Sequence, residues 1–417
     1  MKTNATQALP VKAGNSGTAN SHHCVFGDLY TRYRSEKSFF GYDPSVLKSG
    51  FQKYGRRSEV EKGLWCLIEM DLFSLLEWDG AALNAYLWKY PLETRINTER
   101  QARRLRTNMI NRLVVMMSEE VNISAWWMPA NILELYEKWF ENRGDAVSRK
   151  YLVDMYLYLT SQKMIRLISD IHSVYQLFGY AKPKKMSNTD LKQIQNRIER
   201  KYPHLYKDQG KVDKVNWTIN TGKYQSKLQP CIDGIVYNLE MGNDHVFYWI
   251  KKLNDCAKLH RIPKCKCVRV VWEILHRFID QNGEYEFVRE QICALQKLYK
   301  RMTHKEKPIY LYHAVLLIVR RDEIDWSTKP PQIDTPMVDV DKLYSDHSRN
   351  GKMGMDDYVL DIHTRGVKRT ANSMQKFGIE GAFVKNENEK FLNKEYREIY
   401  ILLKKELDLH FGRGGKR

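Results

Sequence analysis

The chain has 417 residues, which at roughly 100–200 residues per domain suggests two or three packed units. Hydrophobic residues make up 43% of it and aromatic residues 12%, and this apolar content excludes wholesale disorder. Lysine and arginine number 68 against 50 acidic residues, so the formal net charge is +18. A chain this basic is expected to attract polyanions, and nucleic acid or a nucleoprotein complex is the predicted partner.

Cysteine usage and hydropathy indicate the compartment. The seven cysteines are odd in number, which favours a reducing compartment over a disulfide framework. No apolar run approaches the roughly 18 residues of a membrane span. The polar residues 1–20 also lack the apolar stretch of a signal peptide. We therefore expect an intracellular protein, in the cytoplasm, the nucleus or the interior of a virion.

Apolar periodicity predicts helices through the first half of the chain, after a flexible arm over 1–40. Pro44 stands in the first turn of the first helix, and Ser58 with Glu61 has the pattern of a capping box for the second. Four further helices are predicted at 93–121, 125–140, 147–160 and 164–178.

A polar stretch over 182–240 is predicted to be a linker or insertion with one short helix near 190–201, and strand-like alternation occurs at 232–239. Irregular chain is expected at 336–354. The later predicted helices are 246–259, 268–279, 285–302, 308–320, 355–380 and 394–410. We expect a mainly α protein, a multi-helix bundle or irregular helical array in two halves with the polar insertion between them. The predicted units are 1–40, 41–181 (a collar-like helical domain), 182–240, 241–328 and 329–417 (a helical segment with a basic tail).

Motifs of common catalytic sites are absent from the sequence. It contains no G-x-x-x-x-G-K-[ST] phosphate loop, no G-x-S-x-G and no H-E-x-x-H. We therefore expect no enzyme and no cofactor. One set of residues has the ligand chemistry of zinc without the usual spacing, so buried thiols are the favoured interpretation and zinc the alternative: Cys256, His260, Cys265, Cys267 and His276.

A small acidic set offers one further catalytic possibility. Asp357 and Asp361 would share a face of the helix predicted there, with His363 close by. A solvated helix face is the favoured interpretation. An enzyme of unfamiliar type is the alternative, and it requires these three side chains to converge in a cleft.

Basic clusters carry the functional prediction. Each cluster alone is typical of a solvated surface, but together on a chain of charge +18 they favour contacts with backbone phosphates that do not read the bases. The predicted nucleic-acid-binding residues are Arg56, Arg57, Arg103, Arg104, Arg106, Lys184, Lys185, Arg365, Lys368 and Arg369.

Two segments resemble a known helical module. Residues 47–57 (LKSGFQKYGRR) with 60–65 (VEKGLW), and residues 111–122 (NRLVVMMSEEVN), are similar to the C-terminal collar region of clamp-loader-like AAA+ ATPases of the replication-associated recombination family. The ATPase module of that family is absent. The resemblance implies a non-enzymatic scaffold beside DNA in replication or recombination. A homo-oligomer is among the assemblies that it implies.

A third segment, 357–382, is similar to one found in proteins of large eukaryotic DNA viruses. It implies a viral source, and a structural or assembly protein of a virus particle is the alternative function. The collar resemblance also predicts that Arg56 and Arg57 lie in an exposed turn. One shared core is expected from the apolar faces of the neighbouring helices, made of Phe51, Leu64, Leu67, Ile68, Leu72, Leu113, Val114 and Met117.

Overall fold

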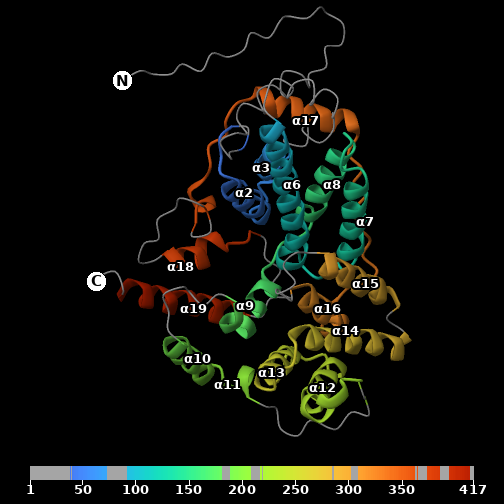
Figure 1. Ribbon diagram of the computed structural model, residues 1–417, viewed down its shortest axis with the longest axis vertical. Helices are drawn as coiled ribbons and strands as arrows, with labels where there is room; N and C mark the ends of the chain where they lie inside the picture. The colour runs from blue at the N-terminus through green and yellow to red at the C-terminus, as the bar shows by residue number, and fades with distance from the viewer. Residues whose placement is uncertain are drawn as a thin grey trace, which may run out of the picture.

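The computed structural model shows a mainly α protein (Figure 1). Among the residues that it describes, the only β-type pairing is an isolated bridge between Val121 and Met164. The predicted fold class is therefore confirmed. The described residues are 40–72, 92–180, 188–207, 219–283, 286–301, 309–361, 373–385 and 394–413, with Ser38, Trp217 and Thr364.

The helices of the first half lie close to their predicted positions. Asp43 caps the first of them, since its side chain accepts a hydrogen bond of 2.9 Å from the backbone N–H of Ser45, and Pro44 fixes the first turn. The elements are α2 (Pro44–Arg56), α3 (Val60–Asp71), α6 (Leu92–Glu120), α7 (Met128–Glu141), α8 (Ser148–Thr160) and α9 (Leu167–Tyr180).

The rest of the chain adds helices of more varied length. α16 is the most apolar of them, and every residue from Ile309 to Val319 is buried. The elements are α10 (Asn188–Lys201), α11 (Pro203–Tyr206), α12 (Gln225–Glu240), α13 (Val246–Leu259), α14 (Lys264–Gln281), α15 (Glu286–Arg301), α16 (Ile309–Val319), α17 (Met337–Arg349), α18 (Ser373–Lys376) and α19 (Lys394–Arg413).

Three segments differ from prediction. The strand-like run 232–239 belongs to α12, whose buried residues Leu228, Ile232, Ile235 and Leu239 recur every three or four positions. Pro230 inside this helix and the polar flanks concealed the helical period. The expectation of a single short helix in 182–240 is therefore wrong.

The other two differences lie near the C-terminus. α17 occupies the predicted irregular stretch 336–354, and the predicted helix 355–380 is instead a 3-10 turn at Asp357–Val359, followed beyond a gap in the described chain by α18 and a π turn at Phe377–Gly381. Contacts with α2 shape this segment: Lys53 Nζ donates to the Tyr358 carbonyl at 2.7 Å. Tertiary contacts therefore override the local helical pattern.

The predicted shared core is confirmed. α2 and α3 form a hairpin that packs across α6, and all eight predicted core residues are buried in one hydrophobic cluster. Leu67 is fully buried at its centre. Gly63 lets α3 approach α8, because a Cβ there would lie 1.7 Å from the Tyr156 hydroxyl.

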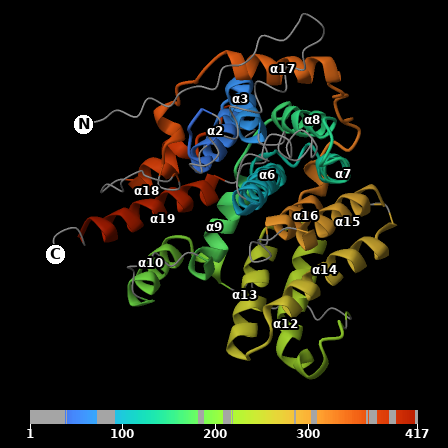
Figure 2. The same ribbon diagram turned by 45° about the horizontal axis from the view of Figure 1, so that its top comes forward.

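The two halves of the chain pack together. α16 contacts α6 and α9 of the first half as well as α12, α14 and α15 of the second (Figure 2). α17 returns to pack on α3 and α8, and α19 packs along α9. In the part of the chain that the structure describes, no helix is long and apolar enough to cross a bilayer.

Candidate functional site

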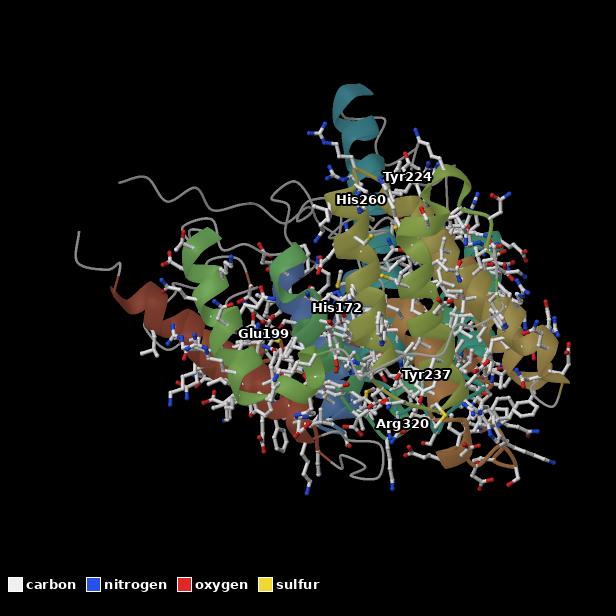
Figure 3. All side chains as sticks on the ribbon, turned by 90° about the horizontal axis from the view of Figure 1, so that it is seen from below. His172, Glu199, Tyr224, Tyr237, His260 and Arg320 are labelled. Carbon is white, nitrogen blue, oxygen red and sulfur yellow. The ribbon has the colours of Figure 1, made fainter. Side chains whose placement is uncertain are left out.

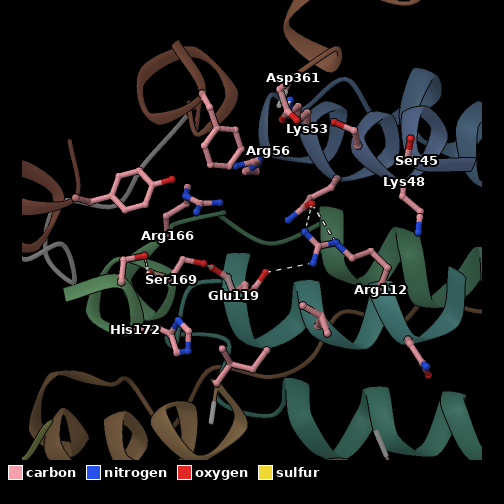
Figure 4. A pocket seen from close by; sticks show the side chains of 18 of the residues that line it. Ser45, Lys48, Lys53, Arg56, Arg112, Glu119, Arg166, Ser169, His172 and Asp361 are labelled. Atoms are coloured by element: carbon pink, nitrogen blue, oxygen red, sulfur yellow. Dashed lines mark hydrogen bonds and ion pairs between the residues drawn. The ribbon is translucent and has the colours of Figure 1, made fainter. Parts of the chain in front are cut away.

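A pocket opens where helices from both halves meet. It encloses about 440 Å³, a size typical of small-molecule and cofactor sites. Its walls come from α2, α6, α9, α16, the π turn and α19 (Figure 4). The lining residues are mainly polar: Ser45, Lys48, Ser49, Gln52, Lys53, Arg56, Asn108, Asn111, Arg112, Val115, Glu119, Arg166, Ser169, His172, Ser173, Ile309, Tyr310, Asp361, Phe377, Tyr400 and Lys404.

Helical periodicity places these side chains together. On α2 the lining residues Lys48, Gln52 and Arg56 are four positions apart, and on α6 the same spacing relates Asn108 to Arg112. The apolar residues on other faces of the same helices, such as Phe51, lie in the core. Each helix therefore presents one face to the core and a polar face to the pocket.

Positive charge dominates the lining. Lys48, Lys53, Arg56, Arg112, Arg166 and Lys404 are cationic, whereas Glu119 and Asp361 are the acidic residues among the lining side chains. Six cations against two acids leave an excess of four positive charges along the lining of this concave, partly desolvated site, and Glu120 beside the lining offsets one of them. Such a site concentrates anions, because low-dielectric walls focus the field.

The most deeply buried charges form what we call the floor triad, Arg56, Arg166 and Glu120. Arg56 Nε lies 3.2 Å from one oxygen of the Glu120 carboxylate, and Arg166 Nη1 lies 3.1 Å from the other. The Arg56 side chain is only 2% exposed and that of Glu120 is fully buried. Two guanidinium groups share one carboxylate, so one positive charge in the floor triad is not neutralised.

The floor triad also contains hydrogen-bond donors for which the described residues supply no acceptor. Nε and Nη1 of Arg56, and Nε of Arg166, are buried without a hydrogen-bond partner among the described residues. Buried polar atoms in folded proteins are nearly always paired, so these donors add to the cost of holding the two guanidinium groups beside the pocket. Figure 4 shows both guanidinium groups at the pocket wall.

Burial makes several of these charges unfavourable. It lowers the pKa of Arg56 to about 10, against the opposing effect of Glu120. Burial likewise opposes the charge of Arg166, but Glu120 and its acidic neighbours outweigh it and raise that pKa. The pKa of Lys404 falls to about 8, through burial and then through Arg166. Burial therefore disfavours the charged forms of Arg56 and Lys404, and an anion bound in the pocket would favour them.

Neighbouring groups orient the remaining cations. Lys53 pairs with Asp361, and burial lowers its pKa to about 8. Arg112 Nε donates to the Gln52 side chain at 3.1 Å, and its Nη1 lies 3.6 Å from Glu119 (Figure 4). Lys404 Nζ lies 4.9 Å from the ring centre of Tyr400 and 5.3 Å from that of Phe377. The lysine ammonium is thus held between rings rather than by a carboxylate.

The predicted exposure of Arg56 and Arg57 is wrong. Arg56 belongs to the floor triad, and Arg57 is buried under the C-terminal segment. The Arg57 guanidinium lies 3.9 Å from the ring centre of Tyr358 and donates to the carbonyl of Glu380. Burial of the adjacent arginines is possible because residues far away in the sequence supply partners for both.

The remaining predicted arginines divide into two kinds. Arg106 is fully buried and donates to the Asp71 carboxylate at 2.9 Å and to Ser148 Oγ at 3.2 Å, so it braces α6 and cannot contact a phosphate backbone. Arg103 and Arg104 are exposed on α6. Lys184, Lys185, Arg365, Lys368 and Arg369 lie outside the described residues.

The candidate zinc set does not converge. Cys256 is half-buried with its thiol directed to the Lys227 carbonyl at 3.4 Å, and Cys267 is buried in the core. Across the described residues, no three His, Cys, Asp or Glu side chains are placed to hold a metal ion. His260 lies toward the periphery in Figure 3, whereas His172 of the pocket lies among the helices. The side chain of Cys265 lies outside the described residues.

The acidic set is dispersed as well. The predicted shared helix face is wrong, since Asp357 is exposed in a 3-10 turn and Asp361 pairs with Lys53. His363 lies outside the described residues. Asp361 nevertheless reaches the pocket, as a partner of a cation rather than as an acid–base group.

Comparison with known proteins gives no assignment: no protein-family model, curated protein or solved structure matches the chain. The segments 47–57 and 111–122 both supply lining residues. Lys53 and Arg56 come from 47–57, and Arg112 and Glu119 come from 111–122. The function therefore has to be argued from the geometry of the pocket.

Proposed function

We propose that the protein binds nucleic acid through its phosphates, with the pocket as the principal contact. The observation that carries the proposal is the cationic lining of the pocket, in which six lysine and arginine side chains stand against two acids and two of the guanidinium groups share the single carboxylate of Glu120. A guanidinium group can donate two parallel hydrogen bonds to two oxygens of one phosphate, so arginine side chains are well suited to a phosphate ligand. The formal charge of +18 supports a polyanion as the source of that phosphate.

The exposed face of α6 offers a path into the pocket. Arg104, Asn108 and Arg112 follow one another at four-residue spacing, from an exposed position to a half-buried one in the lining. A backbone that lies along this face would bring successive phosphates toward Arg112 and Lys48. Contacts of this kind do not distinguish bases, so we expect binding that tolerates any sequence and weakens steeply with salt.

A role beside DNA in replication or recombination is part of the same proposal. The packing of α2 and α3 across α6 as one core supports the collar resemblance, whereas the burial of Arg56 and Arg57 removes their proposed surface role. On this proposal the collar-like helices contribute a pocket for phosphate rather than an exposed basic turn.

The test is binding of fluorescent single-stranded and duplex oligonucleotides to the full chain by anisotropy, across a salt series. The double variant Lys48→Gln, Arg112→Gln removes two partly buried lining cations without touching the floor triad. It should weaken single-strand binding and reduce the slope of log K against log salt by about 1.4, given about 0.7 per phosphate contact.

The matched control is Lys297→Gln, Lys300→Gln, which removes the same charge from exposed positions of α15. It should retain most of the affinity and the slope. Negligible binding of every oligonucleotide at low salt would sink the proposal. Equal losses in the two double variants would show that charge on the surface, and not the pocket, is responsible.

A further inference from the structure

We propose that the floor of the pocket binds a terminal phosphate, that is, a phosphomonoester at a strand end or on a nucleotide, in preference to an internal phosphodiester. This inference rests on the proposed function and names the chemical group that the same site selects. It is carried by the charge of the floor, by its unengaged donors and by the way the helices enclose it.

The charge around the floor matches a dianion. Two nearby acids have cationic partners of their own, since Asp170 pairs with Arg397 and Glu119 with Arg112. The other charges leave an excess of two positive charges, with four cations against two carboxylates: Arg56, Arg166, Lys53 and Lys404 against Glu120 and Asp361. A phosphomonoester carries about −1.5 to −2 charges at neutral pH, whereas each internal phosphodiester carries one. A monoester therefore neutralises the floor, and a diester leaves part of the buried charge uncompensated.

A phosphomonoester also offers the floor more acceptor oxygens than a diester does. Arg56 and Arg166 flank one carboxylate, each with donors that have no partner. Lys404 stands beside them on α19 with aromatic rings as its near neighbours. A monoester offers three terminal oxygens to these groups, whereas an internal diester offers two non-bridging oxygens. With three terminal oxygens, a monoester can offer each of the three cationic side chains an oxygen of its own.

Enclosure restricts how the ligand enters. Arg56, Tyr310 and Tyr400 are nearly fully buried in the lining, whereas Asn108 on α6 is exposed, and we take the mouth to lie on the side of Asn108. A group that reaches the floor is surrounded by helices, and the molecule that carries it leaves through the mouth. An internal phosphate is joined to a sugar on both sides, whereas a terminal phosphate has one connection and fits this arrangement.

The experiment compares ligands that differ only in the phosphate. Three oligonucleotides of one sequence carry a 5′-phosphate, a 3′-phosphate or neither, and their affinities for the full chain are measured by anisotropy. Adenosine 5′-monophosphate and adenosine are compared in parallel by thermal shift. We expect one or both phosphorylated strands to bind at least about tenfold more tightly than the unphosphorylated strand, a difference of about 1.4 kcal/mol, because charge-assisted hydrogen bonds to the terminal phosphate are gained. Inorganic phosphate should abolish that preference.

The outcomes separate this inference from the proposed function. If all three strands bind equally and the monophosphate stabilises no more than adenosine, the preference for a terminal phosphate is overturned while nucleic-acid binding stands. If no strand binds but the monophosphate alone stabilises the chain, nucleic-acid binding fails and the monoester site stands. If nothing binds, both fail. The end that binds more tightly, 5′ or 3′, identifies which terminus the mouth admits.

Variants locate the effect. Lys404→Gln should reduce the preference for the phosphorylated strand about five- to tenfold, whereas Lys405→Gln, the exposed neighbour on the same helix, should leave it unchanged. Arg166→Lys keeps a positive charge opposite Glu120 but loses the paired donors of the guanidinium group. It serves as a second test of the floor if Lys404→Gln folds poorly. A preference that survives both substitutions would overturn the assignment of the floor.

Discussion

The floor triad predicts a large and specific response to Glu120→Gln. The substitution keeps the size of the side chain and an oxygen that can accept from Gln52, but it removes the carboxylate between two buried guanidinium groups. Arg56 then loses its ion-pair partner, whereas Arg166 keeps only the attraction of Asp170 and Glu119. The perturbation is therefore almost purely electrostatic.

The magnitude follows from two opposing effects. Each ion pair with charges about 4 Å apart contributes about 4 kcal/mol at an effective dielectric constant near 20, so removal of the carboxylate loses two such attractions. It also removes the desolvation penalty of the fully buried Glu120, which is several kcal/mol. We expect a net loss in the free energy of unfolding of about 3–5 kcal/mol, as for other buried pairs that lose one partner.

Urea unfolding followed by tryptophan fluorescence measures this loss. The control is Glu119→Gln on the same helix, whose carboxylate is partly exposed and lies 3.6 Å from Arg112. It should change stability by less than about 1 kcal/mol. Inorganic phosphate should raise the unfolding midpoint of Glu120→Gln more than that of the unaltered chain, because the anion replaces the lost carboxylate. Equal small losses in both variants would refute the reasoning.

Other predictions concern the core and the pH response. Leu67→Ala should lower the free energy of unfolding by about 2–5 kcal/mol in urea titrations, because it opens a cavity in the core shared by three helices. Gly63→Ala should cost about 1–3 kcal/mol in the same assay, since the new Cβ meets the buried Tyr156 hydroxyl, whereas an unchanged midpoint would show that α3 shifts freely. The pKa of Lys404 is about 8 in the folded chain and near 10.4 in the unfolded chain, so between these pH values the unfolded chain holds more protons on Lys404. The contribution of this group to the free energy of unfolding therefore rises with pH across this window. Lys404→Gln should flatten that rise in unfolding measurements at several pH values.

The apolar pattern of the sequence was sufficient for the helical framework. Leu64, Leu67 and Ile68 repeat at helical spacing, and their burial with Leu113 required no information beyond that period. The pattern failed where tertiary contacts decide the conformation. Residues 355–361 follow a helical pattern but lie extended around a single 3-10 turn, because Lys53 and its neighbours bind their backbone and side chains.

The pocket was not predicted, although part of its signal is local. Lys48, Gln52 and Arg56 form a polar stripe beside the apolar stripe of α2, and such a second stripe favours a polar partner surface. The remaining lining residues come from helices far along the chain, up to Lys404, and no local period relates them.

The predicted exposure of Arg56 and Arg57 is wrong for a related reason. Two adjacent guanidinium groups are costly to bury unpaired, and this premise predicts an exposed turn. The fold instead supplies Glu120 for Arg56, and the Tyr358 ring with the Glu380 carbonyl for Arg57. These partners lie between about 60 and 320 positions away, so burial could not be inferred from the neighbouring sequence.

The central claim is that the pocket is a phosphate site, and anomalous diffraction from crystals soaked in tungstate, a heavy tetrahedral dianion, tests it most directly. The account predicts an anomalous peak within hydrogen-bond distance of the Arg56 and Arg166 guanidinium groups, on the side of Lys404. Peaks confined to exposed arginines such as Arg103 and Arg104, with the pocket empty, would contradict it.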